Sequence, residues 1–318
     1  MPILISGSLA YDFIMDFPDS FRNHILPEQI HILNVCFVVD KVQKNFGGCA
    51  GNIAYTMNLL GAQPLVLSPL GNDGADYLQK LKKDGLDTDY ITTVADRLTA
   101  SAYITTDKDD NQIIAYYNGA ADLATNLTMD AIKENVSLAL ITPTKKEAML
   151  AHAKQCFDKK IPFVFDPSHQ LTAFTPQELM QIIGQAKYYI ANDYEMKLTQ
   201  EKTGWDQKEM LTHVDVLIIT KGVDGSVIYT KDEQIEVGIC PVQSADDPTG
   251  AGDAYRAGFF AALNQGHDWR TCGQVGAVAA SYAIEHYGTQ NHSFTIAEFK
   301  DRFVKAFGRP LIWGAEVE

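Results

Sequence analysis

One short run of the chain combines small residues with acidic ones: Asp246-Asp247-Pro248-Thr249-Gly250-Ala251-Gly252-Asp253. The residues after it have the composition of a helix, so Gly250, Ala251 and Gly252 are expected at a helix N-terminus. The N–H groups of a first turn lack intrahelical acceptors and lie at the positive end of the helix dipole. Because small side chains let a ligand approach the backbone, this run predicts a phosphate-binding site.

Asp253 makes the prediction more specific. A carboxylate beside a phosphate is costly unless it contacts the hydroxyl that attacks the phosphorus, where it can accept the proton as general base. Phosphoryl transfer needs mainly positioning, charge neutralisation and an in-line nucleophile. The alternative is a capped helix, with Thr249 as N-cap and Asp253 favoured by the dipole. The run matches neither the GxxxxGK[ST] pattern nor GxGxxG.

Apolar runs typical of strands alternate with helical segments along most of the chain. A helix is expected after Gly51 up to Gly61, and another over residues 76–83. Strands are expected at residues 4–6, 64–70, 138–142, 162–166, 188–191 and 214–220. This alternation favours a mostly parallel sheet that helices cover on both faces.

Two segments interrupt the alternation, at about residues 12–46 and 97–122. The second segment predicts a hairpin with an acidic turn at Lys108-Asp109-Asp110-Asn111. We expect the two segments to form a small sheet outside the main one, which serves either as a lid or as a surface hairpin without function. No linker interrupts the chain, so residues 1–318 are expected to form one domain. The tail after Arg309 is expected to be loose.

Composition excludes several classes of protein. The chain has 318 residues and a net charge of −14, which disfavours nucleic acid and anionic membranes as partners. No apolar run is long enough to span a bilayer, and the N-terminus resembles a first strand rather than a signal peptide. The odd number of cysteines, without a CxxC pair, predicts a cytoplasmic protein without disulfides: Cys36, Cys49, Cys156, Cys240 and Cys272.

The run from Asp247 to Phe259, DPTGAGDAYRAGF, resembles the DTxGAGD signature of the ribokinase-like (pfkB-type) kinases. Further segments resemble that family in the same order along the chain: GSLAYD at 7–12, GGCAGNIA at 47–54, NDYE at 192–195 and KG at 221–222. The resemblance implies an α/β fold with a doubly wound, mostly parallel sheet and a small β-sheet lid. It also implies ATP and Mg²⁺ as cofactors.

The resemblance implies a role for each matching residue. Asp253 would be the base, and Gly250, Ala251 and Gly252 would form the anion hole. Substrate hydroxyls would be held by Asp12, Gly48 and Asn52. Mg²⁺ would be positioned through water by Asn192 and Glu195. ATP would contact Asn192, Lys221, Gly222, Gly225 and Thr249. The family also suggests a K⁺ ion near Asp247, Thr249 and Gly288.

Three features favour a nucleoside as the acceptor. The expected lid carries Tyr103, Tyr116 and Tyr117, whose rings could stack on a base. DPTGAGDAYRAGF and the GTQ segment at 288–290 are close to bacterial adenosine kinases. The segment at 166–170 resembles their substrate side, where His169 and Gln170 could reach a base or ribose. The prediction is transfer of the ATP γ-phosphate to the 5′-hydroxyl of a nucleoside, with adenosine first.

Other functions stay open. A sugar kinase of the same family, acting on ribose, fructose or ketodeoxygluconate, would have lid aromatics that face away from the substrate. A nucleoside-binding sensor without turnover is a different class, which the presence of Asp253, Asn192 and Glu195 disfavours. A nicotinamide-dependent oxidoreductase is disfavoured because GxGxxG is absent. The expected partners are small molecules, and the expected assembly is a monomer or a homodimer.

Overall fold

The computed structural model describes residues 1–109 and 111–314, and their main sheet has nine strands. The strand order is β13-β12-β11-β10-β9-β8-β1-β4-β5. All neighbours from β11 to β5 pair in parallel, whereas β12 and β13 form an antiparallel edge. The strands are β1 (Ile3–Ser6), β4 (Pro64–Gly71), β5 (Ile91–Val94), β8 (Leu138–Ile141), β9 (Phe163–Phe165), β10 (Tyr188–Asn192), β11 (Val216–Thr220), β12 (Ser226–Thr230) and β13 (Gln234–Val237).

Alternate residues of the central strands enter two separate apolar cores. In β1, Ile3 and Ile5 belong to one core and Leu4 belongs to the other. In β11, Ile218 and Leu217 are divided in the same way. A strand buried on both faces reads as a continuous apolar run, which is why these segments were recognisable in the sequence.

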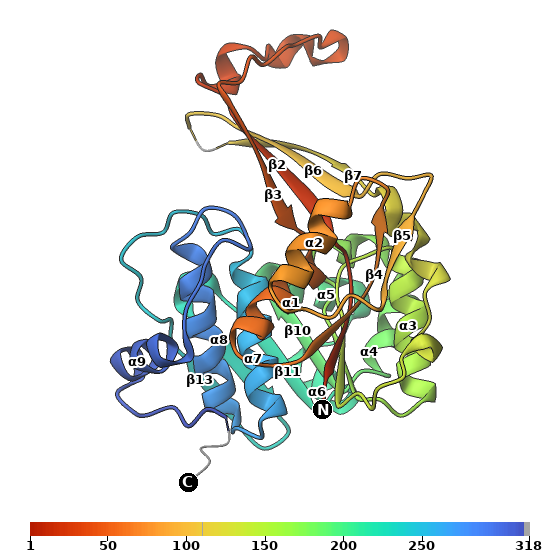
Figure 1. Ribbon diagram of the computed structural model, residues 1–318, viewed down its shortest axis with the longest axis vertical. Coiled ribbons are helices and arrows are strands. Elements are labelled where there is room, and N and C mark those ends of the chain that lie inside the picture. Colours follow the sequence, from red (N-terminus) through yellow and green to blue (C-terminus); the bar gives the residue numbers. More distant parts are fainter. Residues whose placement is uncertain (110, 315–318) are drawn as a thin grey trace.

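Helices cover both faces, as expected (Figure 1). One layer contains α1 (Cys49–Leu59), α2 (Ala75–Lys83), α7 (Ala251–Asn264), α8 (Trp269–Ile284) and α9 (Ile296–Phe307). The other contains α3 (Lys146–Asp158), α4 (Pro176–Ile183), α5 (Asp193–Thr203) and α6 (Gln207–His213). The chain builds outward from β1 in both directions, so the β1–β8 boundary is the switch point where open α/β sheets bind ligands.

The two interrupting segments form a separate four-stranded sheet of order β3-β2-β6-β7, which confirms the small sheet expected from the sequence. Its strands are β2 (Ala10–Asp16), β3 (Lys41–Gly47), β6 (Ala100–Thr106) and β7 (Gln112–Tyr117). The sheet rises from the body beside α1 and α2 (Figure 1). Of the expected hairpin turn, Asp110 lies outside the described residues.

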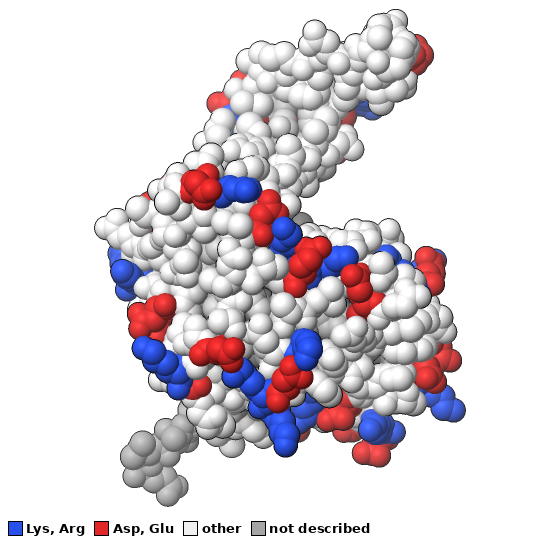
Figure 2. Space-filling view, turned by 90° about the vertical axis from the view of Figure 1, so that its right-hand side faces the viewer, with Lys and Arg blue, Asp and Glu red and all other residues white. Residues whose placement is uncertain are grey.

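An arm, residues 17–40, extends the lid at its far end (Figure 1). It contains two 3-10 turns, η1 (Phe21–Asn23) and η2 (Pro27–Ile32). Four further 3-10 turns lie in the body: η3 (Gly119–Asn126), η4 (Met129–Ala131), η5 (Ser168–Ala173) and η6 (Gly222–Asp224). The arm exposes five large apolar side chains, Leu26, Ile30, Ile32, Leu33 and Val38. Figure 2 shows few charges on the arm, whereas acidic and basic side chains are interspersed over the body below it.

The C-terminal segment differs from its prediction. Leu311 and Trp313 are buried, and the indole Nε1 of Trp313 donates a hydrogen bond to the carbonyl of Leu60 at 2.9 Å. The expectation of a loose tail is therefore wrong for residues 310–314, because the indole ring packs against His267 and Phe299. Residues 315–318 lie outside the described part of the chain.

Within the described ranges, no helix combines the length and the apolar character that crossing a bilayer requires.

Candidate active site

The run that is expected to bind phosphate forms the start of α7, as its composition predicts. Gly250 is the N-cap, with φ +80°. A Cβ atom there would lie 2.9 Å from Cγ2 of Thr289, so both the backbone conformation and the close approach require glycine. The N–H of Ala251 donates to the carbonyl of Pro248 at 3.2 Å. The next N–H groups of the turn remain available for an anion, because a helix supplies them no acceptor.

Asp253 lies in this first turn and is half-buried. Its Oδ2 accepts a hydrogen bond from Nδ2 of Asn52 on α1 at 2.8 Å. Burial raises the pKa of Asp253, while Arg256 and hydrogen bonds from Asn52 and Cys49 oppose that rise. A carboxylate with an elevated pKa is a stronger base than an ordinary one, which suits it to accept a proton from a hydroxyl.

A buried ion pair lies directly behind Asp253. Arg256 Nε is 2.5 Å from Oδ2 of Asp166, and its second terminal nitrogen donates to Oδ1 at 2.8 Å. Both side chains are less than a tenth exposed. Arg256 also interacts electrostatically with Asp253 and Glu195, so one fixed positive charge serves three carboxylates. Neither Arg256 nor Asp166 is among the residues predicted for the site, although the i, i+3 spacing of Asp253 and Arg256 on one helix is a usable signal.

On the other side of Asp253 lie the residues expected to hold the acceptor. Asp12 is on β2, at the base of the lid, and Gly48 is the N-cap of α1, which carries Asn52. Burial, followed by the negative charges of Asp253 and Asp247, raises the pKa of Asp12 to about 6. The structure therefore brings Asp12, Asn52 and Asp253 together from three distant segments.

Of the three tyrosines expected in the lid, Tyr116 lies on one face of the small sheet, and Tyr103 and Tyr117 lie on the other. Tyr116 pairs with Ala102, which pairs with Asp12, so Asp12 and Tyr116 share the face toward the site. Burial and the charges of Cys49 and Asp12 raise the pKa of the Tyr116 phenol. Tyr103 follows Ala102 on the same strand, so its side chain lies on the opposite face. There it stacks on Phe13, with ring centroids 5.0 Å apart. The structure thus corrects the grouping of Tyr103 with Tyr116, because side chains alternate between faces along a strand.

Asn192 and Glu195 form a capping box at the start of α5. The side chain of Asn192 accepts from the Glu195 N–H at 2.7 Å, and that of Glu195 accepts from the Asn192 N–H at 2.8 Å. Burial raises the pKa of Glu195, and Arg256 opposes this. An oxygen that accepts one N–H still has a lone pair for a metal-bound water. The pair therefore fits Mg²⁺ held through water, the mode that Mg²⁺ prefers, better than direct ligation.

His169 and Gln170 lie in the turn η5 after β9. The charge that acts on His169 is Glu195, not Asp12. The turn η5 packs against α5, so His169 lies near the helix that carries Glu195.

Asp247 connects the residues expected near K⁺. Its Oδ1 accepts from the N–H of Thr249 at 2.9 Å, and its Oδ2 accepts from the N–H of Gly288 at 3.0 Å. Asp247 is buried, so these bonds fix the loop before α7 to the loop after α8. The oxygen donors suit a hard cation, but holding the two loops together already explains this carboxylate.

A cavity of about 430 Å³ adjoins the anion hole. Gly222 and Gly225 line one side and Ala251 and Gly252 line another, with mostly apolar side chains between them. Lys221 is not among the lining residues, although its N–H donates to the Gly225 carbonyl at 2.7 Å and so shapes the turn. A largely apolar cavity that opens onto an anion-binding helix terminus can accommodate a nucleotide base and its phosphates.

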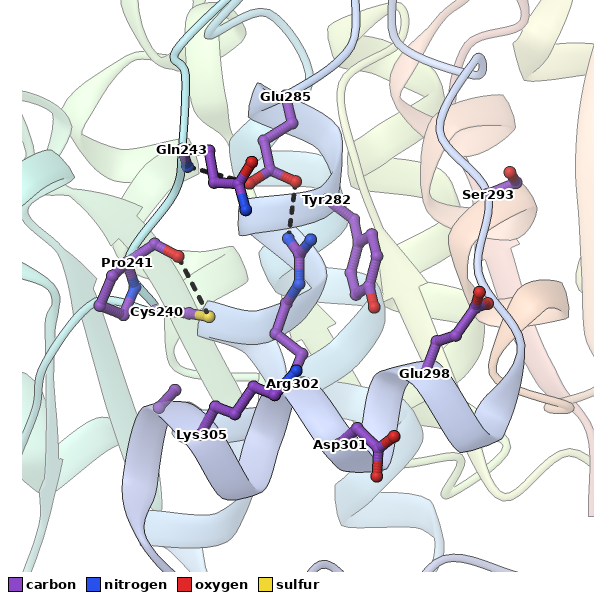
Figure 3. A pocket seen from close by; sticks show the side chains of 11 residues that line it. Cys240, Pro241, Gln243, Tyr282, Glu285, Ser293, Glu298, Asp301, Arg302 and Lys305 are labelled. Carbon is purple, nitrogen blue, oxygen red and sulfur yellow. Dashed lines mark hydrogen bonds and ion pairs between the residues drawn. The ribbon is translucent and has the colours of Figure 1, made fainter.

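A second cavity, of about 490 Å³, lies beside α9 (Figure 3). Its Arg302 is already engaged, since it contacts Glu285 at 2.8 Å and lies over the Tyr282 ring at 3.7 Å. Glu285 in turn accepts from the N–H of Gln243 at 3.2 Å. These contacts connect α9 to the segment 239–248, which forms a wall of the 430 Å³ cavity. The contacts of Arg302 and Glu285 therefore help to hold a wall of the 430 Å³ cavity in position.

Comparisons with known proteins agree with this geometry. A model of the pfkB family carbohydrate kinases matches residues 23–296. The nucleoside kinase of Methanocaldococcus jannaschii is 33% identical over 301 residues, which are 94% of this chain and 95% of that protein. The nucleoside kinase of Burkholderia thailandensis, solved in complex with inosine, has a TM-score of 0.89 and 38% identity, covering 97% of this chain and 99% of that one.

A ribokinase from Thermotoga maritima has a TM-score of 0.80 at 22% identity, covering 96% of this chain and 99% of that one, which supports the fold alone. The family match covers most of the chain, and relatives above 30% identity span nearly all of it. This chain therefore belongs to the pfkB family of carbohydrate kinases and has the ribokinase-like fold.

Proposed function

We propose that this kinase transfers the γ-phosphate of ATP to the 5′-hydroxyl of a nucleoside, with adenosine as the first candidate and Asp253 as the general base. The observation that carries the proposal is the position of Asp253. It lies in the first turn of α7, beside the N–H groups that would bind the anion and close to the lid face that presents Asp12 and Tyr116. The relatives named nucleoside kinases, and the neighbour solved with ADP and inosine, support a nucleoside acceptor.

In the proposed reaction, Asp253 accepts the hydroxyl proton as the oxygen attacks the γ-phosphorus. The first-turn N–H groups of α7 stabilise the charge on the transferring phosphoryl group. Arg256 favours the ionised form of Asp253, which the loss of hydration opposes. Asp12 accepts hydrogen bonds from the sugar hydroxyls, and the 430 Å³ cavity holds the ATP base. When bound, Mg²⁺ near Asn192 and Glu195 supplies further charge neutralisation.

The remaining finer proposals follow the family resemblance. A K⁺ ion near Asp247 would support the loop before α7. Purine salvage in the cytoplasm is the proposed physiological setting. The assembly is proposed as a monomer or a homodimer, and the apolar side chains of the arm would be covered in a homodimer.

A sugar kinase is the second candidate function. One observation favours it: Tyr103 faces away from the site, so the lid offers Tyr116 as its stacking ring. A smaller acceptor needs fewer aromatic contacts than a purine does.

The acceptor is identified by ADP release with Mg²⁺-ATP across adenosine, inosine, guanosine, cytidine, ribose, fructose and ketodeoxygluconate, with and without K⁺. We expect the highest kcat/KM on a purine nucleoside, with the product at the 5′-phosphate. Turnover only on a free sugar would reject the nucleoside assignment while keeping Asp253 as base. No turnover on any of these acceptors would favour the sensor.

Asp253→Asn tests the base. The amide has nearly the same shape but cannot accept the proton, so kcat should fall by about 10² or more. ADP affinity, measured by calorimetry, and the melting temperature should stay near the wild-type values. Asp232→Asn, an exposed change of the same kind, serves as the control. Near-full turnover by Asp253→Asn would remove Asp253 from the mechanism.

Tyr116→Ala and Tyr103→Ala form a matched pair that tests the face assignment. Loss of a stacking ring costs about 1–3 kcal/mol per base, so Tyr116→Ala should raise the nucleoside KM by about tenfold. Tyr103→Ala should change it by less than about twofold, since its ring stacks on Phe13 instead. Equal effects of the two changes on KM would contradict the assignment.

Asp12→Asn should raise the thermal stability of the ligand-free protein but weaken the binding of the acceptor. The folded pKa of about 6 exceeds the ordinary value of 3.8, so between these pH values the folded state binds more protons than the unfolded state. The free energy of unfolding therefore falls as pH rises through this window. At pH 7.5 the ligand-free variant should melt higher than wild type, and the difference should shrink below pH 5.

In the same variant the acceptor KM should rise about tenfold or more, because hydrogen bonds to a charged group are lost. Steady-state kinetics and thermal melts in one buffer series measure both effects. A variant that melts lower at pH 7.5 would show that the Asp12 charge stabilises the fold.

A further inference from the structure

A chain of four hydrogen bonds leads to Asp253 from the backbone of the lid. The hydroxyl of Tyr77 on α2 donates to the carbonyl of Gly47 at 2.6 Å. Gln290 Nε2 donates to that hydroxyl oxygen at 2.8 Å and to Oδ1 of Asn52 at 3.0 Å. Asn52 Nδ2 then donates to Asp253 at 2.8 Å. We refer to Tyr77, Gln290 and Asn52 as the relay.

The hydrogen bonds of the relay can run in only one direction, because the relay ends at the backbone carbonyl of Gly47. A backbone carbonyl can only accept, so the Tyr77 hydroxyl must donate to Gly47 and has its oxygen free to accept. Because that oxygen accepts, the atom of Gln290 beside it must be the amide nitrogen. The second N–H of the same nitrogen then requires an acceptor, which is the side-chain oxygen of Asn52. The Asn52 NH₂ group is thereby turned toward Asp253. A hydrogen-bond network is what decides such amide orientations.

The opposite orientation would place the Asn52 oxygen against Asp253. Two acceptors cannot form a hydrogen bond unless one of them carries a proton, so that arrangement would suit a protonated Asp253. The observed orientation of the Gln290 and Asn52 amides therefore favours the ionised form of Asp253 over its protonated form.

The relay is closed to solvent. Tyr77, Gln290 and Asn52 are each at most 5% exposed, so water cannot readily replace a broken link. The bonds also pass close above α1, since a Cβ at Gly51 would lie 2.1 Å from the Tyr77 hydroxyl oxygen. Gln290 Oε1 is among the buried side-chain atoms of the described residues that have no hydrogen-bond partner. An unpaired buried oxygen is costly, so both N–H bonds of Gln290 are kept at the expense of its oxygen.

We propose that Gln290 and Tyr77 are positioning residues for phosphoryl transfer, which orient the Asn52 amide so that it donates to the Asp253 carboxylate. The proposal rests on the proposed role of Asp253 as base. Neither residue touches a substrate in this scheme. Their effect reaches the reaction through Asn52 alone.

Gln290→Glu tests the direction of the relay. The new carboxylate accepts only, so both Tyr77 and Asn52 would have to donate to it, and the Asn52 oxygen would turn toward Asp253. We expect kcat to fall about 10–100-fold, the effect of losing a hydrogen bond to a charged group. Asp253 would ionise at higher pH, so the acid limb of the kcat/KM profile should move upward by about one pH unit. The KM for ATP should change less than about twofold.

Tyr77→Phe keeps the ring and removes the anchoring hydroxyl, so it tests the relay even if Gln290→Glu does not fold. Loss of one neutral hydrogen bond predicts a fall in kcat of about 3–10-fold, with a smaller shift of the acid limb in the same direction. Gln274→Glu and Tyr282→Phe, buried changes of the same kinds on α8, should leave the pH profile unchanged. Melting temperatures establish that each variant is folded.

Asp253→Asn, measured in parallel, separates the two levels of the proposal. If it abolishes turnover while folded Gln290→Glu or Tyr77→Phe keeps the wild-type kcat and pH profile, the relay is wrong and the base assignment stands. If Asp253→Asn stays active, the base assignment fails and the relay with it. A fall in kcat without any shift of the acid limb would assign Gln290 and Tyr77 a purely structural role.

Discussion

In the proposed reaction, the site depends on keeping the half-buried carboxylate of Asp253 ionised where further negative charge must arrive. Asp253 is surrounded by Asp12, Asp166 and Glu195, and burial alone would favour its protonated form. Arg256 is the fixed positive charge that offsets this, and its bidentate pairing with Asp166 holds it in place. Since a guanidinium does not lose its proton at physiological pH, this compensation does not depend on pH.

The fold delivers these groups through the ends of its elements. Asp166 follows β9, Asn192 ends β10 and is the N-cap of α5, and Asp253 lies in the first turn of α7. Strand ends and helix starts meet at one edge of a parallel sheet, where N–H groups are unpaired and dipoles point outward. In the proposed function, helix capping and catalysis therefore share atoms. The Asn192–Glu195 box closes α5 while it presents oxygens toward the Arg256 side of the site.

The lid shows how far pattern analysis extends. The hairpin was predictable from two strand-like runs on either side of an acidic turn, and β6 and β7 pair as expected. Which tyrosine faces the site was not predictable, because a shift of one residue in register reverses every side chain. The pairing of Phe13 with Tyr103 and of Asp12 with Ala102 set that register. Trp313 was misjudged for a similar reason: its partner, the Leu60 carbonyl, is 253 residues away.

The sequence by itself determined the alternating α/β architecture, the small second sheet and the small-residue start of α7. Each of these features depends on residues that are neighbours in the sequence: the hydrophobic periodicity, the turn residues and the small residues before Asp253. Only the tertiary structure decided which groups surround Asp253. Gln290 reaches Asn52 across 238 residues, and Arg256 reaches Asp166 across 90. Hydrogen bonds and ion pairs act over a few ångströms of space, whatever the distance along the chain, so they exist only after the chain has folded.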